Sequence, residues 1–266
     1  VLAYAMPLDG QELVISDTYG GLVRMILNDD ALYGTLDGIK ERRNHLSQFM
    51  NFDCLLFTKD GKKLITGNVQ GRIEIRDRHF GYTVLSQFEM DPHQYWPELS
   101  CMAVGRNDKQ LALNRFSGKI ELWDIETMTK TSEIKVARKG ELLSNLQYSP
   151  NSEHLLGLKK VKPNQYKIWH YHFQTGKTTY SHMDADMVDE DDIRINRAGF
   201  FDNLHSWTVT NSTLRDWNVA DGTSVGKDHP CNTDADFALS NDRSTVAYLG
   251  RNCDRNISRN ASDDEI

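Results

Sequence analysis

The chain has 266 residues, of which 39% are hydrophobic and 26% are charged. Its net charge of -7 does not favour a nucleic-acid binder, because affinity for DNA or RNA rests on a basic surface. No apolar run approaches the roughly 18 residues that a membrane-spanning helix needs, so no membrane association is expected.

One short pattern recurs along the chain. A weak copy occupies Gly21–Leu27, and clearer copies occupy Gly71–Asp77, Gly118–Asp124, Asn164–His170 and Ser212–Asn218. The five copies begin 50, 47, 46 and 48 residues apart. A steady period of this length indicates a repeat architecture.

The second repeat shows the internal plan of each unit most clearly. Residues 54–58, 63–66, 72–76 and 82–88 read as four short strands, and Lys59–Lys62 supplies a tight turn after the first. Polar and apolar residues alternate in the third strand, which places Ile73 and Ile75 on one face of the sheet.

Two families of turns recur at fixed places in the units. Asp, Asn, Gly and Pro suit such turns because they tolerate turn dihedrals or preset φ. The turns after the first strand are at 8–10, 59–62, 107–109, 149–151, 201–203 and 240–242. Those after the third strand are at 78–79, 126–127, 174–176 and 220–222. Two turn families in every unit leave little room for helices.

The pattern resembles the WD40 repeat in its "sPDG"-like turn, its G-x-I-x-L-W-D strand and its T-G turn. The only true Trp-Asp pair is Trp123-Asp124, and the corresponding pairs elsewhere are Arg76-Asp77, Trp169-His170 and Trp217-Asn218. There is no Gly-His dipeptide, so the buried Asp-His-Ser-Trp hydrogen-bond set of the strongest family members cannot be assembled. We therefore expect a divergent member of the family.

The resemblance implies an all-β fold, a WD40-like β-propeller of four-stranded blades. We expect five complete blades at residues 1–45, 46–92, 93–138, 139–188 and 189–230, a partial sixth at 231–250, and a polar tail at 251–266. Five and a half blades do not close a ring comfortably. We expect seven or more blades in the complete ring, with the remaining strands outside this sequence; a partner chain or separate segment is the alternative.

An aromatic loop at residues 90–97 is the first candidate binding feature. Tyr95 and Trp96 offer large contact area at little entropic cost, as hot-spot residues do, although Trp96 could instead cover the edge of a blade. Arg115-Phe116 and Lys159-Lys160 are predicted in equivalent loops between second and third strands. The resemblance puts these loops and the aromatic loop on one rim, while solvated loop lysines are the simpler alternative.

Residues 184–192 hold six carboxylates, Asp189 and Glu190 among them. This connection between the fourth and fifth units reads as a solvated surface loop, as a docking segment for a basic partner, or as a calcium site. It lacks the glycine and closing glutamate of an EF-hand loop. The resemblance puts this segment on the same rim as the aromatic loop.

His170 and His172 are the nearest approach to a metal site. Residues i and i+2 of a strand share a face, so the two imidazoles could converge on a zinc ion, with His182 further along. Two polar residues on an exposed strand explain the pair equally well. We predict no metal or cofactor site, and neither a nucleophile elbow nor a phosphate-binding loop is present.

The sequence therefore favours a non-catalytic protein–protein interaction scaffold that binds peptides or domains as part of a larger protein or complex. One alternative is a propeller enzyme with a site in the central channel. The other is an RNA-associated propeller in a ribonucleoprotein complex, for which Lys159, Lys160 and Lys162 are the evidence. Cys54, Cys101, Cys231 and Cys253 show no CxxC spacing, which predicts free buried thiols in a reducing compartment and an intracellular location, cytoplasmic or nuclear.

Overall fold

The computed structural model describes residues 3–16, 22–27, 36–39, 52–68, 71–89, 99–115, 118–136, 143–162, 165–181, 197–209, 213–230, 237–239 and 246–248. Every regular element in these ranges is a β-strand, which confirms the predicted all-β class. Within the same ranges, no helix has the length and apolarity needed to cross a membrane.

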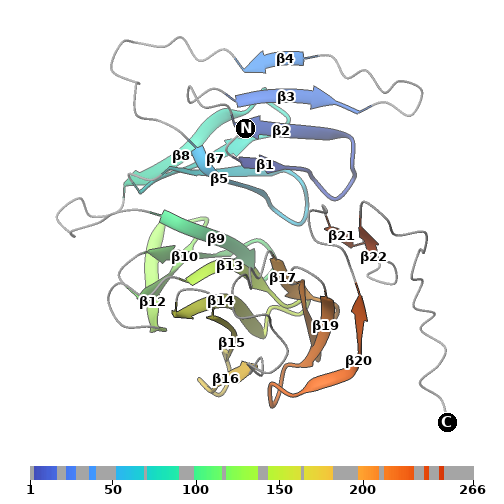
Figure 1. Ribbon diagram of the computed structural model, residues 1–266. Coiled ribbons are helices and arrows are strands. Elements are labelled where there is room, and N and C mark those ends of the chain that lie inside the picture. Colours follow the sequence, from blue (N-terminus) through green and yellow to red (C-terminus); the bar gives the residue numbers. More distant parts are fainter. Residues whose placement is uncertain are drawn as a thin grey trace. The chain divides into compact units, whose positions relative to one another are not determined.

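The strands form five four-stranded sheets and one two-stranded hairpin, each in chain order (Figure 1). The first sheet comprises β1 (Ala3–Ala5), β2 (Glu12–Ser16), β3 (Leu22–Ile26) and β4 (Leu36–Ile39). The second comprises β5 (Phe52–Phe57), β6 (Lys63–Asn68), β7 (Arg72–Asp77) and β8 (Thr83–Glu89). The third comprises β9 (Leu99–Gly105), β10 (Gln110–Arg115), β11 (Lys119–Asp124) and β12 (Thr129–Lys135).

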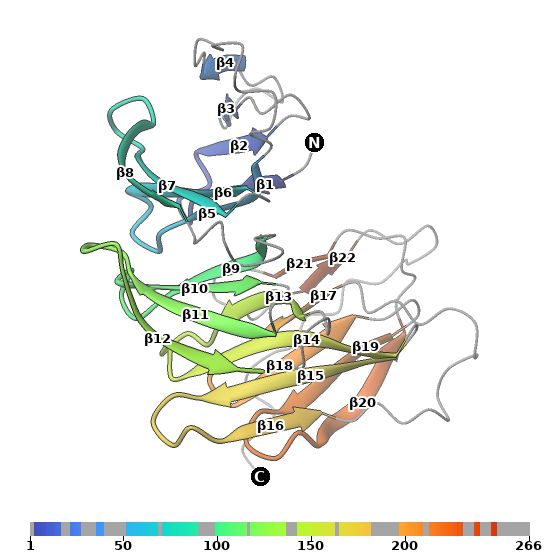
Figure 2. The ribbon, with the colours of Figure 1, turned by 90° about the vertical axis from the view of Figure 1, so that its left-hand side faces the viewer.

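The fourth sheet comprises β13 (Leu143–Tyr148), β14 (His154–Lys162), β15 (Gln165–His172) and β16 (Thr178–Ser181). The fifth comprises β17 (Arg197–Phe200), β18 (His205–Val209), β19 (Thr213–Asn218) and β20 (Ser224–Pro230). The hairpin comprises β21 (Phe237–Leu239) and β22 (Val246–Tyr248). Figure 2 shows the successive strands of the third sheet side by side.

The chain divides into two compact units, residues 1–146 and 147–266. In the first unit the opening strands of neighbouring sheets pack together, β1 against β5 and β5 against β9. An apolar cluster that includes Val14, Leu55 and Leu64 fills the space between the first and second sheets. A second cluster, with Ile73 and Ile75 beside residues of the third sheet, confirms the predicted inward face of β7.

In the second unit β14 packs against β17, and the core again lies between two sheets. Leu156, Leu158 and Ile168 of the fourth sheet meet Phe200 and Trp217 of the fifth. The indole Nε1 of Trp217 donates a buried hydrogen bond of 2.9 Å to Thr208 Oγ1 on the neighbouring strand. The core of each unit is thus built from sheets stacked face to face.

The predicted turns after the first strand recur with the same hydrogen bonds. In the second sheet the buried Thr58 hydroxyl donates to Asp60 Oδ1 (2.7 Å) and accepts from the Lys63 amide (3.0 Å). In the fourth sheet Ser149 makes the equivalent bonds to Asn151 Oδ1 (2.8 Å) and the His154 amide (2.9 Å). A hydroxyl followed two residues later by a side-chain oxygen therefore fixes this turn in both units.

Equivalent turns of neighbouring sheets are also joined to each other. The Asp108 carboxylate of the third sheet accepts hydrogen bonds from the amides of Lys59 (2.6 Å) and Asp60 (3.0 Å) in the second. In the second unit Asn203 Oδ1 of the fifth sheet accepts from the Asn151 amide of the fourth at 2.9 Å. In both of these pairs, one side chain of the later sheet thus fixes the turn of the sheet before it.

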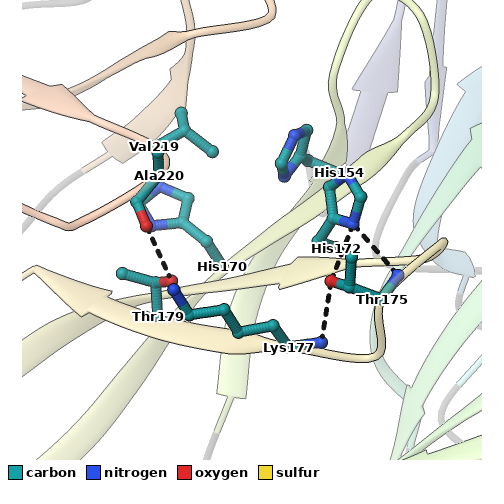
Figure 3. Close-up of a pocket in the computed structure, with 8 residues that line it drawn as sticks. All are labelled: His154, His170, His172, Thr175, Lys177, Thr179, Val219 and Ala220. Atoms are coloured by element: carbon teal, nitrogen blue, oxygen red, sulfur yellow. Dashed lines mark hydrogen bonds between the residues drawn. The ribbon is translucent and has the colours of Figure 1, made fainter.

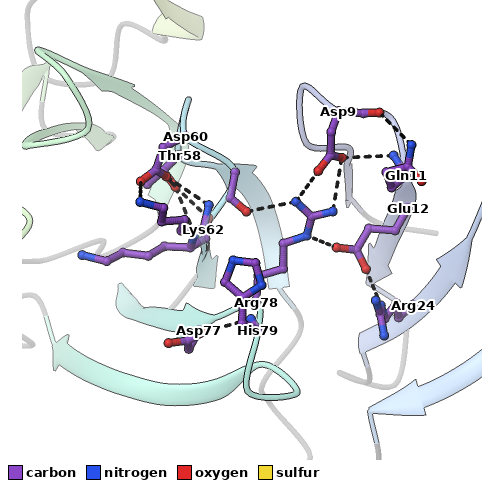
Figure 4. A network of polar contacts seen from close by, with 12 residues as sticks. Asp9, Gln11, Glu12, Arg24, Thr58, Asp60, Lys62, Asp77, Arg78 and His79 are labelled. Carbon is purple, nitrogen blue, oxygen red and sulfur yellow. Dashed lines mark hydrogen bonds and ion pairs between the residues drawn. The ribbon is translucent and has the colours of Figure 1, made fainter.

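Arg78 joins the first and second sheets (Figure 4). Its guanidinium donates to both carboxylate oxygens of Asp9, at 2.7 and 3.2 Å, and also to the buried Glu12, which pairs in addition with Arg24. The hydrogen bond from Arg78 is the main cause that lowers the pKa of Asp9. Burial alone would raise the pKa of Glu12, but its hydrogen bonds, those from Arg24 and Arg78 among them, lower it overall. Glu12 is therefore held as a paired carboxylate.

The last residue of the third strand holds the following turn in place. Asp124 Oδ1 accepts from the amides of Glu126 (3.0 Å) and Thr127 (2.7 Å), and Asn218 Oδ1 accepts from the Ala220 amide (2.8 Å). We refer to this role as the turn cap. It explains why Asp or Asn stands at this place in the repeated pattern.

The fourth copy of the pattern was aligned incorrectly by sequence. His172, not His170, is the residue whose side chain caps the turn, because Thr175 bonds to His172 Nδ1. In the same way, the Gly176 amide donates to His172 O as the Gly222 amide donates to Asn218 O. Trp169-His170 therefore resembles the Trp-Asp pair only in composition; the true counterpart lies two residues later.

The outermost strands of three sheets carry extra residues. In the second sheet Ile75 pairs with Ser86 and Arg76 with Val84, so Leu85 has no partner on β7. In the third sheet the same shift leaves Thr131 without a partner on β11, and its hydroxyl donates to Leu122 O at 3.0 Å. A larger shift occurs between β19 and β20. These are β-bulges, which bend the strand and increase its twist.

Candidate functional site

Most of the predicted rim lies outside the described residues. This applies to Tyr95, Trp96, Phe116, Asp189 and Glu190. Their convergence on one binding face therefore stays a prediction, as does the choice among the roles considered for the acidic segment.

The basic residues of the predicted rim were placed in loops, and this was wrong. Lys159 and Lys160 lie within β14, and Arg115 is the last residue of β10. Lys159 and Lys160 lie in a strand because the hairpin of β14 and β15 is longer than predicted: Lys159 pairs with Lys167 and Lys160 with Tyr166. The Lys159 ammonium lies 5.9 Å from the centre of the Tyr180 ring, within reach of a cation–π interaction.

The structure instead brings three histidines together in a pocket of about 300 Å³ in the second unit (Figure 3). We call it the histidine pocket. Its walls come from β14 to β16 and from the turn between β19 and β20. The lining residues are His154, His170, His172, Thr175, Lys177, Thr179, Val219 and Ala220.

The pairing of β14 with β15 places the histidines. His170 and His172 are two residues apart on β15 and line the same pocket, as their spacing predicted. His154, the first residue of β14, is the register partner of His172, and their ring centres are 4.5 Å apart. His154 could not be identified from the sequence, because no local signal shows which residues of β14 and β15 pair with each other.

The hydrogen bonds of His172 fix its tautomer. The Thr175 amide donates to Nδ1 at 3.1 Å, so this nitrogen carries a lone pair, and the Thr175 hydroxyl also lies 2.9 Å from it. In neutral His172 the proton must then be on Nε2. The turn cap thus leaves His172 with one outward N–H donor.

His170 is only 1% exposed, which contradicts the interpretation of an exposed strand. Its Nε2 lies 2.9 Å from the hydroxyl of Ser206, which is fully buried on β18 of the fifth sheet. Burial, with a smaller contribution from His154, lowers the pKa of His170 to about 3. His170 is therefore neutral at physiological pH, and its Nδ1 is buried without a hydrogen-bond partner among the described residues.

The described residues that line the pocket include a basic group but no acidic one. None of the eight described lining residues is acidic, and Lys177 is the one among them with a permanent positive charge at neutral pH. Burial and the neighbouring His172 lower the pKa of His154. The described lining therefore offers imidazoles, of which that of His170 is neutral, and an ammonium group but no carboxylate.

Zinc at His170 and His172 is not supported by the described residues. No group of three or more His, Cys, Asp or Glu side chains in these ranges is arranged to hold a metal ion. His182, the further histidine considered, lies outside them. Cys54 and Cys101 are not joined in disulfides, as predicted, but both are of intermediate exposure and not buried as expected.

One of the two turns that line the pocket could have been identified from the sequence. Had the fourth copy been aligned on Tyr171-His172, the turn cap and the following Thr175 and Lys177 would have been placed at one sheet end. The contribution of Val219 and Ala220 depends on packing between two sheets, which has no local signal in the sequence.

The sequence matches no protein-family model, and no curated protein matches it significantly.

Proposed function

We propose that the chain is a non-catalytic protein–protein interaction scaffold, a divergent β-propeller of the WD40 type within a larger protein or assembly. The repeated four-stranded sheets support this proposal, as do the two turn families that recur in the order expected of blades. The assignment to the WD40 family rests on the sequence resemblance, and propellers of this family generally act by binding other proteins.

The observation that carries the proposal is the linkage between equivalent turns. Asp108 fixes the turn at Lys59 and Asp60, and Asn203 fixes the turn at Asn151. Within each unit the ends of neighbouring sheets are thereby held in register. A surface whose parts are already in place loses little entropy when a partner binds, which suits it to recognition of a peptide or domain.

The bound partner is expected at the rim that carries Tyr95 and Trp96. The test is affinity capture with the tagged chain, followed by quantitative mass spectrometry and reconstitution with the purified captured protein. Replacing Tyr95 and Trp96 together by alanine should abolish binding, because aromatic hot spots commonly contribute ~2 kcal/mol or more each.

The matched control is Phe80→Ala. Phe80 is 74% exposed in the turn between β7 and β8, so the variant removes an exposed aromatic residue that does not belong to the aromatic loop. This variant should bind as the unmodified chain does, and circular dichroism should be the same for all three proteins. Equal binding by the Tyr95→Ala/Trp96→Ala variant would refute the assigned rim.

A further inference from the structure

We propose that the histidine pocket binds a small oxyanion of the phosphate or carboxylate type. The proposal is independent of the scaffold function, because it concerns a site within the second unit alone. Three features of the pocket support it: its charge, its donors, and a buried nitrogen that lacks a partner.

The charge of the pocket favours an anion over a cation. Lys177 follows the turn capped by His172, and Figure 3 shows its side chain extending across the pocket toward Thr179. No lining residue offers a carboxylate that would neutralise a bound cation. The adjacent Asp221 caps its own turn, since its Oδ1 accepts from the Thr223 amide (2.9 Å) and hydroxyl (2.7 Å). These hydrogen bonds are the main cause that lowers the pKa of Asp221, and the nearby charge of Lys177 adds to the effect.

The hydrogen bonds leave donors available to a ligand. His172 must present Nε2–H, because both groups of Thr175 lie at Nδ1. Lys177 supplies an ammonium with three donors. By contrast, the Thr179 hydroxyl is already used, because it donates to Ala220 O at 3.3 Å. The available groups therefore complement oxygen atoms that carry negative charge.

His170 provides the second, independent observation. Its ring is almost fully buried, its Nε2 is taken by Ser206, and its Nδ1 has no partner among the described residues. A buried polar atom of this kind is costly unless something satisfies it. When the Ser206 hydroxyl donates to Nε2, Nδ1 carries the proton, so a side chain that lines the pocket holds a buried donor with no partner among the described residues.

The volume fits this class of ligand. The pocket of about 300 Å³ is roughly ten times the volume that one water molecule occupies in the liquid, so it accommodates phosphate or a short carboxylate with its waters. Side chains from two sheets line this space, which gives a ligand contacts from more than one direction.

The experiment is a titration of the full chain followed by NMR of the imidazole C–H resonances. Inorganic phosphate and acetate are added in separate arms at constant pH and ionic strength. At least one of them should shift the His172 and His154 resonances saturably, with a Kd of ~1 mM or tighter. Comparison of the two arms decides between the phosphate and carboxylate classes.

Lys177→Gln should weaken binding about tenfold or more, because a charge-assisted hydrogen bond is lost. Lys177→Arg should retain binding. The matched control is Lys167→Gln. It also removes one positive charge, but Lys167 alternates on β15 with His170 and His172 and does not line the pocket. Saturable shifts with neither anion, shifts with Zn²⁺ alone, or equal losses in Lys177→Gln and Lys167→Gln would each overturn the proposal.

Discussion

Acid should weaken the second unit through His170. Folding places its imidazole in a buried site where its pKa is about 3, against about 6.5 in an unfolded chain. Below pH 6.5 the unfolded state therefore binds a proton that the folded state excludes. Because the folded pKa is depressed, the stability contribution is complete above pH 6.5 and is lost progressively as the pH falls toward 3.

The size of the effect follows from these two values. Between pH 7.5 and pH 5.0 the linkage relation gives a loss of ~2 kcal/mol in the free energy of unfolding from this residue alone. This is a large part of the stability of an ordinary domain, which is about 5–15 kcal/mol. The difference is therefore measurable without approaching complete acid denaturation.

The assay is urea denaturation at the two pH values, followed by tryptophan fluorescence. Trp169 and Trp217 are buried in the second unit and report on its unfolding. The reference protein is His170→Phe/Ser206→Ala, which removes the imidazole together with the hydroxyl that pairs with it. The unmodified chain should lose ~2 kcal/mol more than this variant between the two pH values. The same loss in both proteins would show that His170 is not a buried neutral imidazole.

Three further substitutions test the contacts that stabilise the two units. Gly222→Ala should destabilise the second unit by ~2 kcal/mol more than Gly176→Ala in thermal unfolding: both glycines have positive φ, but only at Gly222 would the new Cβ meet a backbone carbonyl, at 2.4 Å. Equal losses would contradict this. Arg78→Ala should cost the first unit ~3 kcal/mol in urea denaturation because it strips a partner from a buried carboxylate, and Glu12→Gln should recover part of it; no recovery would mean that the charge of Glu12 is not the cause. Asp108→Ala should speed hydrogen exchange at the Lys59 and Asp60 amides about tenfold, since each loses its acceptor, and unchanged exchange would contradict the proposed linkage between turns.

The strands could be predicted because their signals are local. The alternation that places Ile73 and Ile75 inward, and the turn residues on either side, lie within a few positions of one another. The alignment of the fourth copy was wrong for a physical reason. The turn cap needs only a side-chain acceptor, so Asp, Asn and His all serve, and composition alone could not show that His172 had the role rather than His170.

The histidine pocket was beyond sequence reasoning for a different reason. It needs the cross-strand partnership of His154 with His172 and the approach of the turn at Ala220 to Thr179. Neither contact is local in the chain, since the second joins residues 41 positions apart. The spacing of His170 and His172 indicated a shared face, but only the packing of two sheets shows that this face lines a pocket.

The bulges on the outer strands have a consequence for how the protein behaves at high concentration. A regular edge strand offers unpaired amides and carbonyls that can template the addition of a strand from another molecule. At Leu85 and Thr131 the extra residue breaks that row, and on β12 the flanking Lys130 and Lys135 add charge. Edge-to-edge aggregation is thereby opposed on β8 and β12 even though Val84 and Leu85 are exposed, and a natural partner has no regular ladder to extend along them.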